Sequence, residues 1–188
     1  RGNAFIYQGE ELGLPQAFVP FEHLKDPEAI ANWPRTLGRD GARTPMPWVA
    51  GAVNSGFSDG EPWLPVDPAH DPLSIDVQER DPHSALNVTR ELVGIRKSLA
   101  TLRLGDLRFI DAPDGVLAFE RRIEGQCVTC VFNIGHETVS FSPPAGNTAG
   151  VVATQDGRVN GSVGLPAYIE PWTGYWAISG TGDGQGTD

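Results

Sequence analysis

The order of apolar and polar positions first marks a short apolar run and a long aperiodic segment. Residues 4–8 (AFIYQ) are apolar on both faces and end at Gly9, a pattern that predicts a buried strand of a parallel sheet. Residues 10–70 show little periodicity and contain recurrent proline, glycine and tryptophan, which predicts a long loop without long helices. Because this segment is rich in aromatic side chains, we expect it to pack on itself.

The clearest helical pattern follows this loop. Apolar residues recur at seven-residue spacing in two adjacent rows, Ala85, Leu92 and Leu99 in one and Leu86, Val93 and Ala100 in the other. Rows at this spacing lie on one face of a helix, so the pattern predicts an amphipathic helix. Asp81 is a favourable N-cap and Pro82 suits the first helical position, so we expect the helix to run from there to about Ala100.

Beyond Thr101 the pattern changes to short β segments separated by turns. Residues 107–111 and 116–122 flank a Pro-Asp-Gly turn, which predicts a β-hairpin. Further strands at the spacing of a β-sandwich are expected at residues 127–133, 138–141, 151–154, 168 and 175–178. Residues 180–188 are rich in glycine, aspartate and threonine and are expected to be a flexible tail.

Composition and charge exclude several classes of partner and site. The 188 residues carry 24 acidic and 14 basic side chains, a net charge of −10, which argues against binding to nucleic acid or to an anionic membrane. The chain has no apolar run long enough for a membrane span. Its four histidines are scattered without ligand spacing, so we expect neither a metal site nor a cofactor.

The two cysteines, Cys127 and Cys130, are a C-x-x-C pair on a predicted strand. An odd spacing places the two side chains on opposite faces of the strand, so we expect two reduced, partly buried thiols. Free thiols and the absence of a leader pattern favour a cytoplasmic location. Because the chain begins with Arg1, and because one strand and one helix cannot form a core, we expect a piece of a longer protein. The alternative is a trimmed but complete domain.

Two blocks of sequence resemble a known family. Residues 5–13 (FIYQGEELG) closely resemble the eighth-strand segment of the α-amylase superfamily, glycoside hydrolase family 13. Residues 38–48 (GRDGARTPMPW) resemble its α-glucosidase and oligo-1,6-glucosidase branch, and residues 56–66 extend the match. The resemblance implies the C-terminal end of a (β/α)8 barrel at residues 1–103, with its last strand, a long loop and its last helix. An antiparallel β-sandwich would follow at residues 104–179, then the tail.

The resemblance also implies the chemistry. A retaining α-glucosidase of this family acts on oligosaccharides or disaccharides and takes its catalytic carboxylates from strands four, five and seven. All of these would precede Arg1, so we expect no catalytic residue in this chain, which alone would be inactive. Its partner would be the missing N-terminal barrel portion. Adjacent Glu10 and Glu11 are unsuited to act as a catalytic pair, because neighbouring side chains diverge.

Four residues are expected to bind substrate: Glu10, Arg39, Asp40 and Arg43. The carboxylate of Glu10 follows the predicted strand and can accept hydrogen bonds from sugar hydroxyls, or it can anchor the loop. The resemblance implies that an arginine of the second block contacts the innermost glucose; Arg43 is our first choice and Arg39 our second. Asp40 would orient a guanidinium. The alternative is an ion-paired cluster that only fixes the loop.

Other activities remain open on this evidence. Within the fold, trehalose synthase, sucrose isomerase and α-amylase are alternatives, and a non-catalytic homologue that partners a transporter is another. The C-terminal region as a carbohydrate-binding module is disfavoured, because its aromatic residues crowd one terminal segment. Phe21, Trp33 and Trp63 are candidates for stacking on sugars, but we favour a core of the loop's own.

Overall fold

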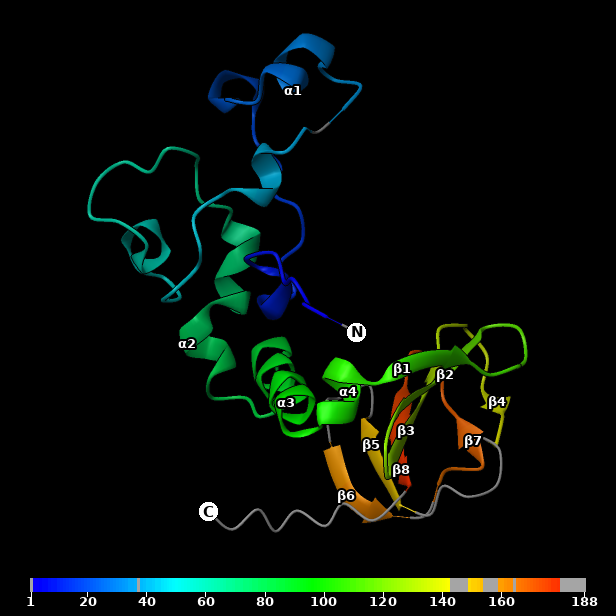
Figure 1. Cartoon of the computed structure of the whole chain (residues 1–188). Coiled ribbons are helices and arrows are strands. Elements are labelled where there is room, and N and C mark those ends of the chain that lie inside the picture. The colour runs from blue at the N-terminus through cyan, green and yellow to red at the C-terminus, as the bar shows by residue number, and fades with distance from the viewer. Residues whose placement is uncertain (1, 37, 143–148, 154–158, 164, 180–188) are drawn as a thin grey trace. The chain divides into compact units, whose positions relative to one another are not determined.

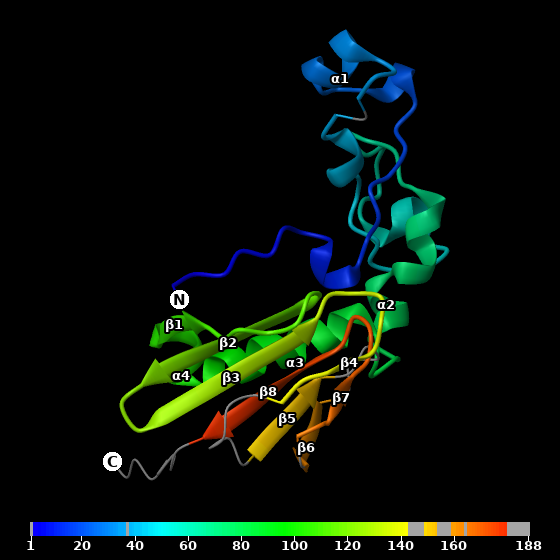
Figure 2. The ribbon, with the colours of Figure 1, turned by 90° about the vertical axis from the view of Figure 1, so that its right-hand side faces the viewer.

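The computed structural model describes residues 2–36, 38–142 and 165–179, and the backbone of residues 149–153 and 159–163 (Figures 1 and 2). It divides the chain into two compact units, and each is described by itself. We call residues 5–90 the loop unit, and residues 1–4 with 91–188 the sheet unit. The tail expected at residues 180–188 lies outside the described residues.

The loop unit is built from short helical turns, as the lack of periodicity predicted. Its helices before residue 85, five 3₁₀ and two α, are η1 (Glu10–Leu12), η2 (Phe21–His23), α1 (Pro27–Asn32), η3 (Asp40–Ala42), η4 (Val53–Gly56), η5 (Pro68–Leu73) and α2 (Ile75–Gln78). None of these seven exceeds six residues. Backbone groups in such a segment need partners other than helix or sheet ladders, and side chains supply many of them.

The strand predicted at residues 4–8 does not form, so this prediction is wrong for the described chain. Residues 2–7 have no regular structure, and the side chains of Phe5, Ile6 and Tyr7 are exposed. A strand of a parallel sheet exists only where neighbouring strands pair with its backbone groups. The described residues of the loop unit include no other strand, so this pairing is missing.

The loop unit packs partly on its own aromatic and aliphatic side chains. Its buried cluster consists of Val19, Leu24, Ala29 and Leu64, with Trp33 packed against it. The ring of Trp33 lies 6.0 Å from Phe18 and 5.8 Å from Phe21 between centroids. Self-packing is therefore confirmed for this part of the loop. Trp48 and Trp63, by contrast, are 49% and 61% exposed.

The predicted helix begins later than expected and is divided in two. α3 spans Ala85–Ser98 and α4 spans Ala100–Leu104, with Leu99 in an extended conformation between them. The hydroxyl of Ser84 accepts a hydrogen bond from the Asn87 N–H at 3.3 Å and caps α3. Asp81 instead accepts from the His83 N–H in the preceding turn. Asp81 as the N-cap is therefore wrong.

The sheet unit contains a six-stranded antiparallel sheet and a two-stranded one (Figure 2). The larger sheet has the order β1-β2-β3-β8-β5-β6, and its strands are Asp106–Phe109, Val116–Ile123, Gln126–Asn133, Gly174–Ser179, Ala149–Ala153 and Val159–Val163. The smaller sheet pairs β4 (Val139–Ser140) with β7 (Tyr168–Ile169). The predicted hairpin is confirmed as β1 and β2, with Phe109 opposite Phe119. β6 was not predicted.

The two faces of the large sheet have separate cores. One face carries the cluster Ala118, Val131, Ile169, Tyr175 and Ala177, which joins it to the small sheet through β7. The other carries Val128 and Cys130, which form a cluster with Leu102 of α4, and Ile95 of α3 packs against it. Cys127 lies three residues before Cys130 on β3, hence on the opposite face, and both thiols are free and buried. This confirms the expectation for the cysteine pair.

No helix in the described part of the chain is both long and apolar enough to cross a bilayer. The longest, α3, has 14 residues.

Cys130 is expected to resist thiol reagents in the folded protein. Burial raises the pKa of its thiol to about 12, and the thiolate is the reactive form. Labelling with a chromogenic disulfide at about pH 8 should modify a Cys127→Ser variant, which keeps Cys130, only as fast as the sheet unit unfolds. The matched Cys130→Ser variant keeps Cys127, 8% exposed, and should label faster. Rapid labelling of Cys130 in the native state would contradict the packing described above.

Candidate functional site

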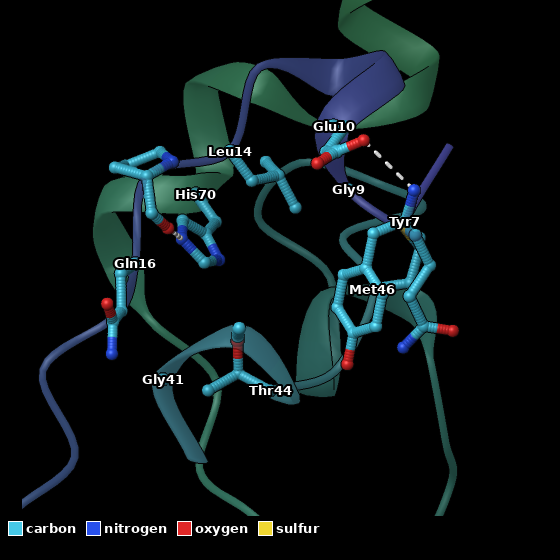
Figure 3. A pocket seen from close by; sticks show the side chains of 12 residues that line it. Tyr7, Gly9, Glu10, Leu14, Gln16, Gly41, Thr44, Met46 and His70 are labelled. Carbon is cyan, nitrogen blue, oxygen red and sulfur yellow. Dashed lines mark hydrogen bonds between the residues drawn. The ribbon is translucent and has the colours of Figure 1, made fainter. Parts of the chain in front are cut away.

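A cavity of about 220 Å³ lies within the loop unit (Figure 3). Its wall joins the segment before and within η1, the chain that follows η1, the block around η3, and one residue of η5. The lining residues are Tyr7, Gln8, Gly9, Glu10, Leu14, Pro15, Gln16, Gly41, Ala42, Thr44, Met46 and His70. The two sequence blocks that resemble the α-amylase superfamily, residues 5–13 and 38–48, therefore meet at this one cavity.

The first block turns sharply at Gly9, which has φ +98°. The following carboxylates hold this turn: Glu10 accepts a hydrogen bond from the Tyr7 N–H at 3.0 Å, and Glu11 accepts one from the Gly9 N–H at 2.8 Å. Glu10 is exposed and lines the cavity, whereas Glu11 does not line it. Glu10 thus anchors the loop, which is one of the two roles considered for it, and it also lies on the cavity wall, where its expected role in substrate binding stays a prediction.

The second block contacts the chain that follows η1 through Gly41. Its carbonyl oxygen accepts a hydrogen bond from the Ala17 N–H at 2.9 Å. A Cβ atom at position 41 would lie 2.2 Å from the Ala17 carbonyl oxygen, closer than any real contact. Glycine is therefore required here because two backbone segments touch.

Arg39 is held by a buried aspartate of the preceding helix. Its Nε and Nη2 atoms donate to the two carboxylate oxygens of Asp26 at 3.0 and 2.9 Å, and its backbone N–H donates to the same carboxylate at 2.9 Å. Asp26 also caps α1 by accepting from the Glu28 N–H. These hydrogen bonds, led by the Arg39 side chain, keep the pKa of the Asp26 carboxyl well below its usual range.

Asp40 is completely buried, and in the described residues its carboxylate binds backbone N–H groups where a hydrogen bond to a guanidinium was expected. Its Oδ2 accepts hydrogen bonds from the N–H groups of Lys25 and Asp26 at 2.6 and 2.8 Å. Its Oδ1 has no partner among the residues that the structure describes. The role expected of Asp40 belongs to Asp26, which sequence reasoning missed. Its place before Pro27, an N-cap pattern, was the available signal.

Arg43 differs from Arg39 in its surroundings. It is half-buried, and its backbone N–H donates to the Asp40 carbonyl at 2.9 Å. Its neighbours Ala42 and Thr44 line the cavity, but its own side chain does not. Across residues 2–36, 38–142 and 165–179, we find no hydrogen bond or ion pair to its guanidinium. That group is therefore not already committed to a carboxylate in the described chain.

No group of three or more histidine, cysteine, aspartate or glutamate side chains in the described residues is arranged to hold a metal ion.

Replacing Asp26 by asparagine is expected to flatten the loss of stability in acid. Because the pKa of the folded carboxyl is lowered, its stabilisation is complete above the unfolded pKa of about 3.9 and is lost as the pH falls below that value. Thermal unfolding between about pH 7 and pH 2 measures the effect. Asn at the exposed Asp59 is the matched control. If the Tm of Asp26→Asn fell as steeply with decreasing pH as that of the wild type, the lowered pKa of Asp26 would be contradicted.

Replacing Gly41 by alanine should destabilise the loop unit by about 1–3 kcal/mol, since the added methyl group must push two backbone segments apart. Gly51→Ala offers a comparison, because its Cβ would meet nothing within 4 Å, although its φ of +69° carries a cost of its own. Denaturant unfolding measures both variants. Equal stability of Gly41→Ala and the wild type would show that the contact with Ala17 is not tight.

Comparison with known proteins identifies relatives of this chain. The family described as "Alpha amylase, catalytic domain" matches residues 1–105. A "Probable alpha-glucosidase" of Rhizobium meliloti is 40% identical over 77% of this chain and 26% of its own length. A "Probable oligo-1,6-glucosidase 2" of Bacillus subtilis is 34% identical over 77% of this chain and 29% of its own. The chain thus spans less than a third of the length of these curated relatives.

Solved structures agree with this relationship. The crystal structure of an α-glucosyl transfer enzyme, XgtA, is 37% identical, with a TM-score of 0.79 over 93% of this chain and 32% of that chain. Trehalulose synthase MutB from Pseudomonas mesoacidophila MX-45 is 27% identical, with a TM-score of 0.74 over 95% of this chain and 36% of that chain. On the family match over more than half of its residues, the chain belongs to the α-amylase family of glycoside hydrolases.

Proposed function

We propose that this chain is part of a retaining α-glucosidase and supplies one wall of its glucose pocket. The observation that carries the proposal is the cavity at which the two family blocks meet, with Glu10 on one side and residues 41–46 on the other. The two relatives named above, which align with 77% of this chain, are a probable α-glucosidase and a probable oligo-1,6-glucosidase. The substrate class is therefore an oligosaccharide or disaccharide with α-glucosidic bonds.

The bond-breaking carboxylates come from another part of the whole protein. Retaining glycosidases need two carboxyl groups about 5–5.5 Å apart on either side of the scissile bond. Glu10 and Glu11 are consecutive, and each carboxylate accepts a hydrogen bond from a backbone N–H just before η1. They are therefore suited to holding the turn, and the chain alone would not catalyse hydrolysis.

Binding of glucose falls to Glu10 on the cavity wall and to Arg43. The side chain of Arg43 is not part of that wall but its chain neighbours Ala42 and Thr44 are, so the sugar would have to reach beyond the wall to meet the guanidinium. The Arg43 guanidinium offers five donors, and the Glu10 carboxylate accepts, which together suit the hydroxyl groups of a sugar. Arg39 and Asp40 support them indirectly, because their side chains bind Asp26 and its neighbouring backbone instead.

Free, buried thiols support a cytoplasmic location for the whole protein.

Glucosyl transfer or isomerisation is the second candidate activity. The similarity to an α-glucosyl transfer enzyme and to a trehalulose synthase favours it. The two activities share the covalent step and differ in whether water or a sugar hydroxyl attacks afterwards. Chromatography of products made from sucrose separates them: glucose and fructose in equal amounts indicate hydrolysis, fructose in excess of glucose together with longer sugars indicates transfer, and new disaccharides without free sugars indicate isomerisation.

The proposal predicts that Arg43→Ala in the full-length protein lowers kcat/KM for p-nitrophenyl α-glucoside by roughly 10- to 100-fold, because charged hydrogen bonds to the sugar are lost. Arg43→Lys should recover only part of the loss, since an ammonium lacks the planar fork. Arg35→Ala is the control, an exposed arginine of the same unit. A wild-type kcat/KM for Arg43→Ala would show that Arg43 does not contact the substrate. A full-length protein without α-glucosidase, transfer or isomerase activity would overturn the function itself.

A further inference from the structure

His70 is a buried titratable side chain that the proposed chemistry does not use. It lies in η5 and is only 3% exposed, yet it forms part of the cavity wall. Its Nε2 atom lies 2.8 Å from the carbonyl oxygen of Pro15. Its Nδ1 atom has no hydrogen-bond partner in the described part of the chain. Figure 3 shows this second ring nitrogen directed toward the interior of the cavity.

The contact with Pro15 determines what Nδ1 can do. A carbonyl oxygen only accepts hydrogen bonds, so the Nε2 atom must carry the hydrogen. In the neutral ring, Nδ1 then has a lone pair and is an acceptor. A buried acceptor without a donor is unfavourable, and native proteins provide a donor in nearly every case. A donor, from water in the empty cavity or from a ligand in the occupied one, is therefore expected to meet Nδ1.

The rest of the wall defines the chemical class of that donor. The side chains of Leu14 and Met46 give the cavity an apolar part, and Tyr7, Gln16 and Thr44 bring polar groups to its edge (Figure 3). Glu10 adds a carboxylate, which disfavours an anionic ligand. A ligand with an apolar face and several neutral hydroxyl groups fits this wall, and sugars have both properties.

We propose that the cavity binds a sugar and that Nδ1 of His70 accepts a hydrogen bond from one of its hydroxyl groups. The choice of a sugar rests on the proposed function, whereas the acceptor itself rests on the geometry of His70. His70 lies outside both sequence blocks of the α-amylase family, residues 5–13 and 38–48, so it would add a ligand-binding group that neither block supplies.

Two substitutions separate the two ring nitrogens. His70→Gln places an amide N–H near the position of Nε2, so it can keep the hydrogen bond to Pro15 while the acceptor is lost. His70→Asn places an amide near the position of Nδ1, so it can keep an acceptor in the cavity while the bond to Pro15 is lost. If His70 is only structural, His70→Gln keeps the stability of the protein and His70→Asn lowers it, and neither changes the affinity for a sugar. If Nδ1 binds the ligand, His70→Gln lowers the affinity and His70→Asn retains it.

Calorimetric titration of the full-length protein with methyl α-D-glucoside tests the proposal. We expect His70→Gln to weaken binding about 3- to 10-fold with an unchanged Tm. His70→Asn should bind within about twofold of the wild type but with a lower Tm. Repeating the titration with monodeoxy glucosides should identify one hydroxyl whose removal makes the wild type and His70→Gln bind equally. Wild-type affinity of His70→Gln for every sugar would overturn the proposal.

The outcomes also distinguish this inference from the proposed function. Hydrolysis of p-nitrophenyl α-glucoside together with unchanged sugar binding by His70→Gln would overturn the role of His70 alone. Sugar binding that depends on His70, in a protein without activity on α-glucosides, would support His70 and overturn the function. Long-range nitrogen–proton NMR of the imidazole gives an independent readout. A proton found on Nδ1 in place of Nε2 would contradict the acceptor directly.

Discussion

Two buried aspartates hold together the part of the loop unit that carries the candidate pocket. Asp26 receives the guanidinium and backbone N–H of Arg39, and Asp40 receives the backbone N–H groups of Lys25 and Asp26. Side chains thus hold residues 25–28 and 39–40 together, and they accept hydrogen bonds from N–H groups that lie before or at the start of a helix and have no partner within it. Buried backbone donors need partners, and here carboxylates replace the ladder of a sheet.

The position of the pocket wall follows from this fastening. η3 begins at Asp40, so the same residue whose carboxylate is buried starts the turn that brings Gly41 against Ala17. Ala42 ends this turn, Thr44 follows it, and both line the cavity. In irregular backbone, a few individual contacts determine where the residues of a site lie. In a helix or a sheet, many backbone hydrogen bonds do so together.

The sequence predicted those elements whose formation depends on residues close together in the chain, and it failed for those that depend on distant contacts. The β1–β2 hairpin and the opposite faces of Cys127 and Cys130 follow from alternation along one strand, and both were predicted correctly. The start of α3 was not, because Ser84 and Asp81 are both good N-caps and a distant contact decided between them. Gln78 accepts from the Leu86 N–H and is itself tied to the Leu12 carbonyl. The strand expected at residues 4–8 depends on neighbouring strands, which no local pattern supplies.

The two arginines of the second block show why a motif does not by itself assign a role. Arg39 and Arg43 lie four residues apart and are chemically identical, so nothing in their own positions separates them. The difference arises from Asp26, thirteen residues before Arg39, which bonds to that side chain and leaves Arg43 without a carboxylate in the described chain. A guanidinium already bound to a buried carboxylate would have to break that pair to hold a sugar, and this cost favours the other arginine as the ligand-binding one. His70 extends the same reasoning, because one ring nitrogen is committed to Pro15 and the other remains to meet a ligand.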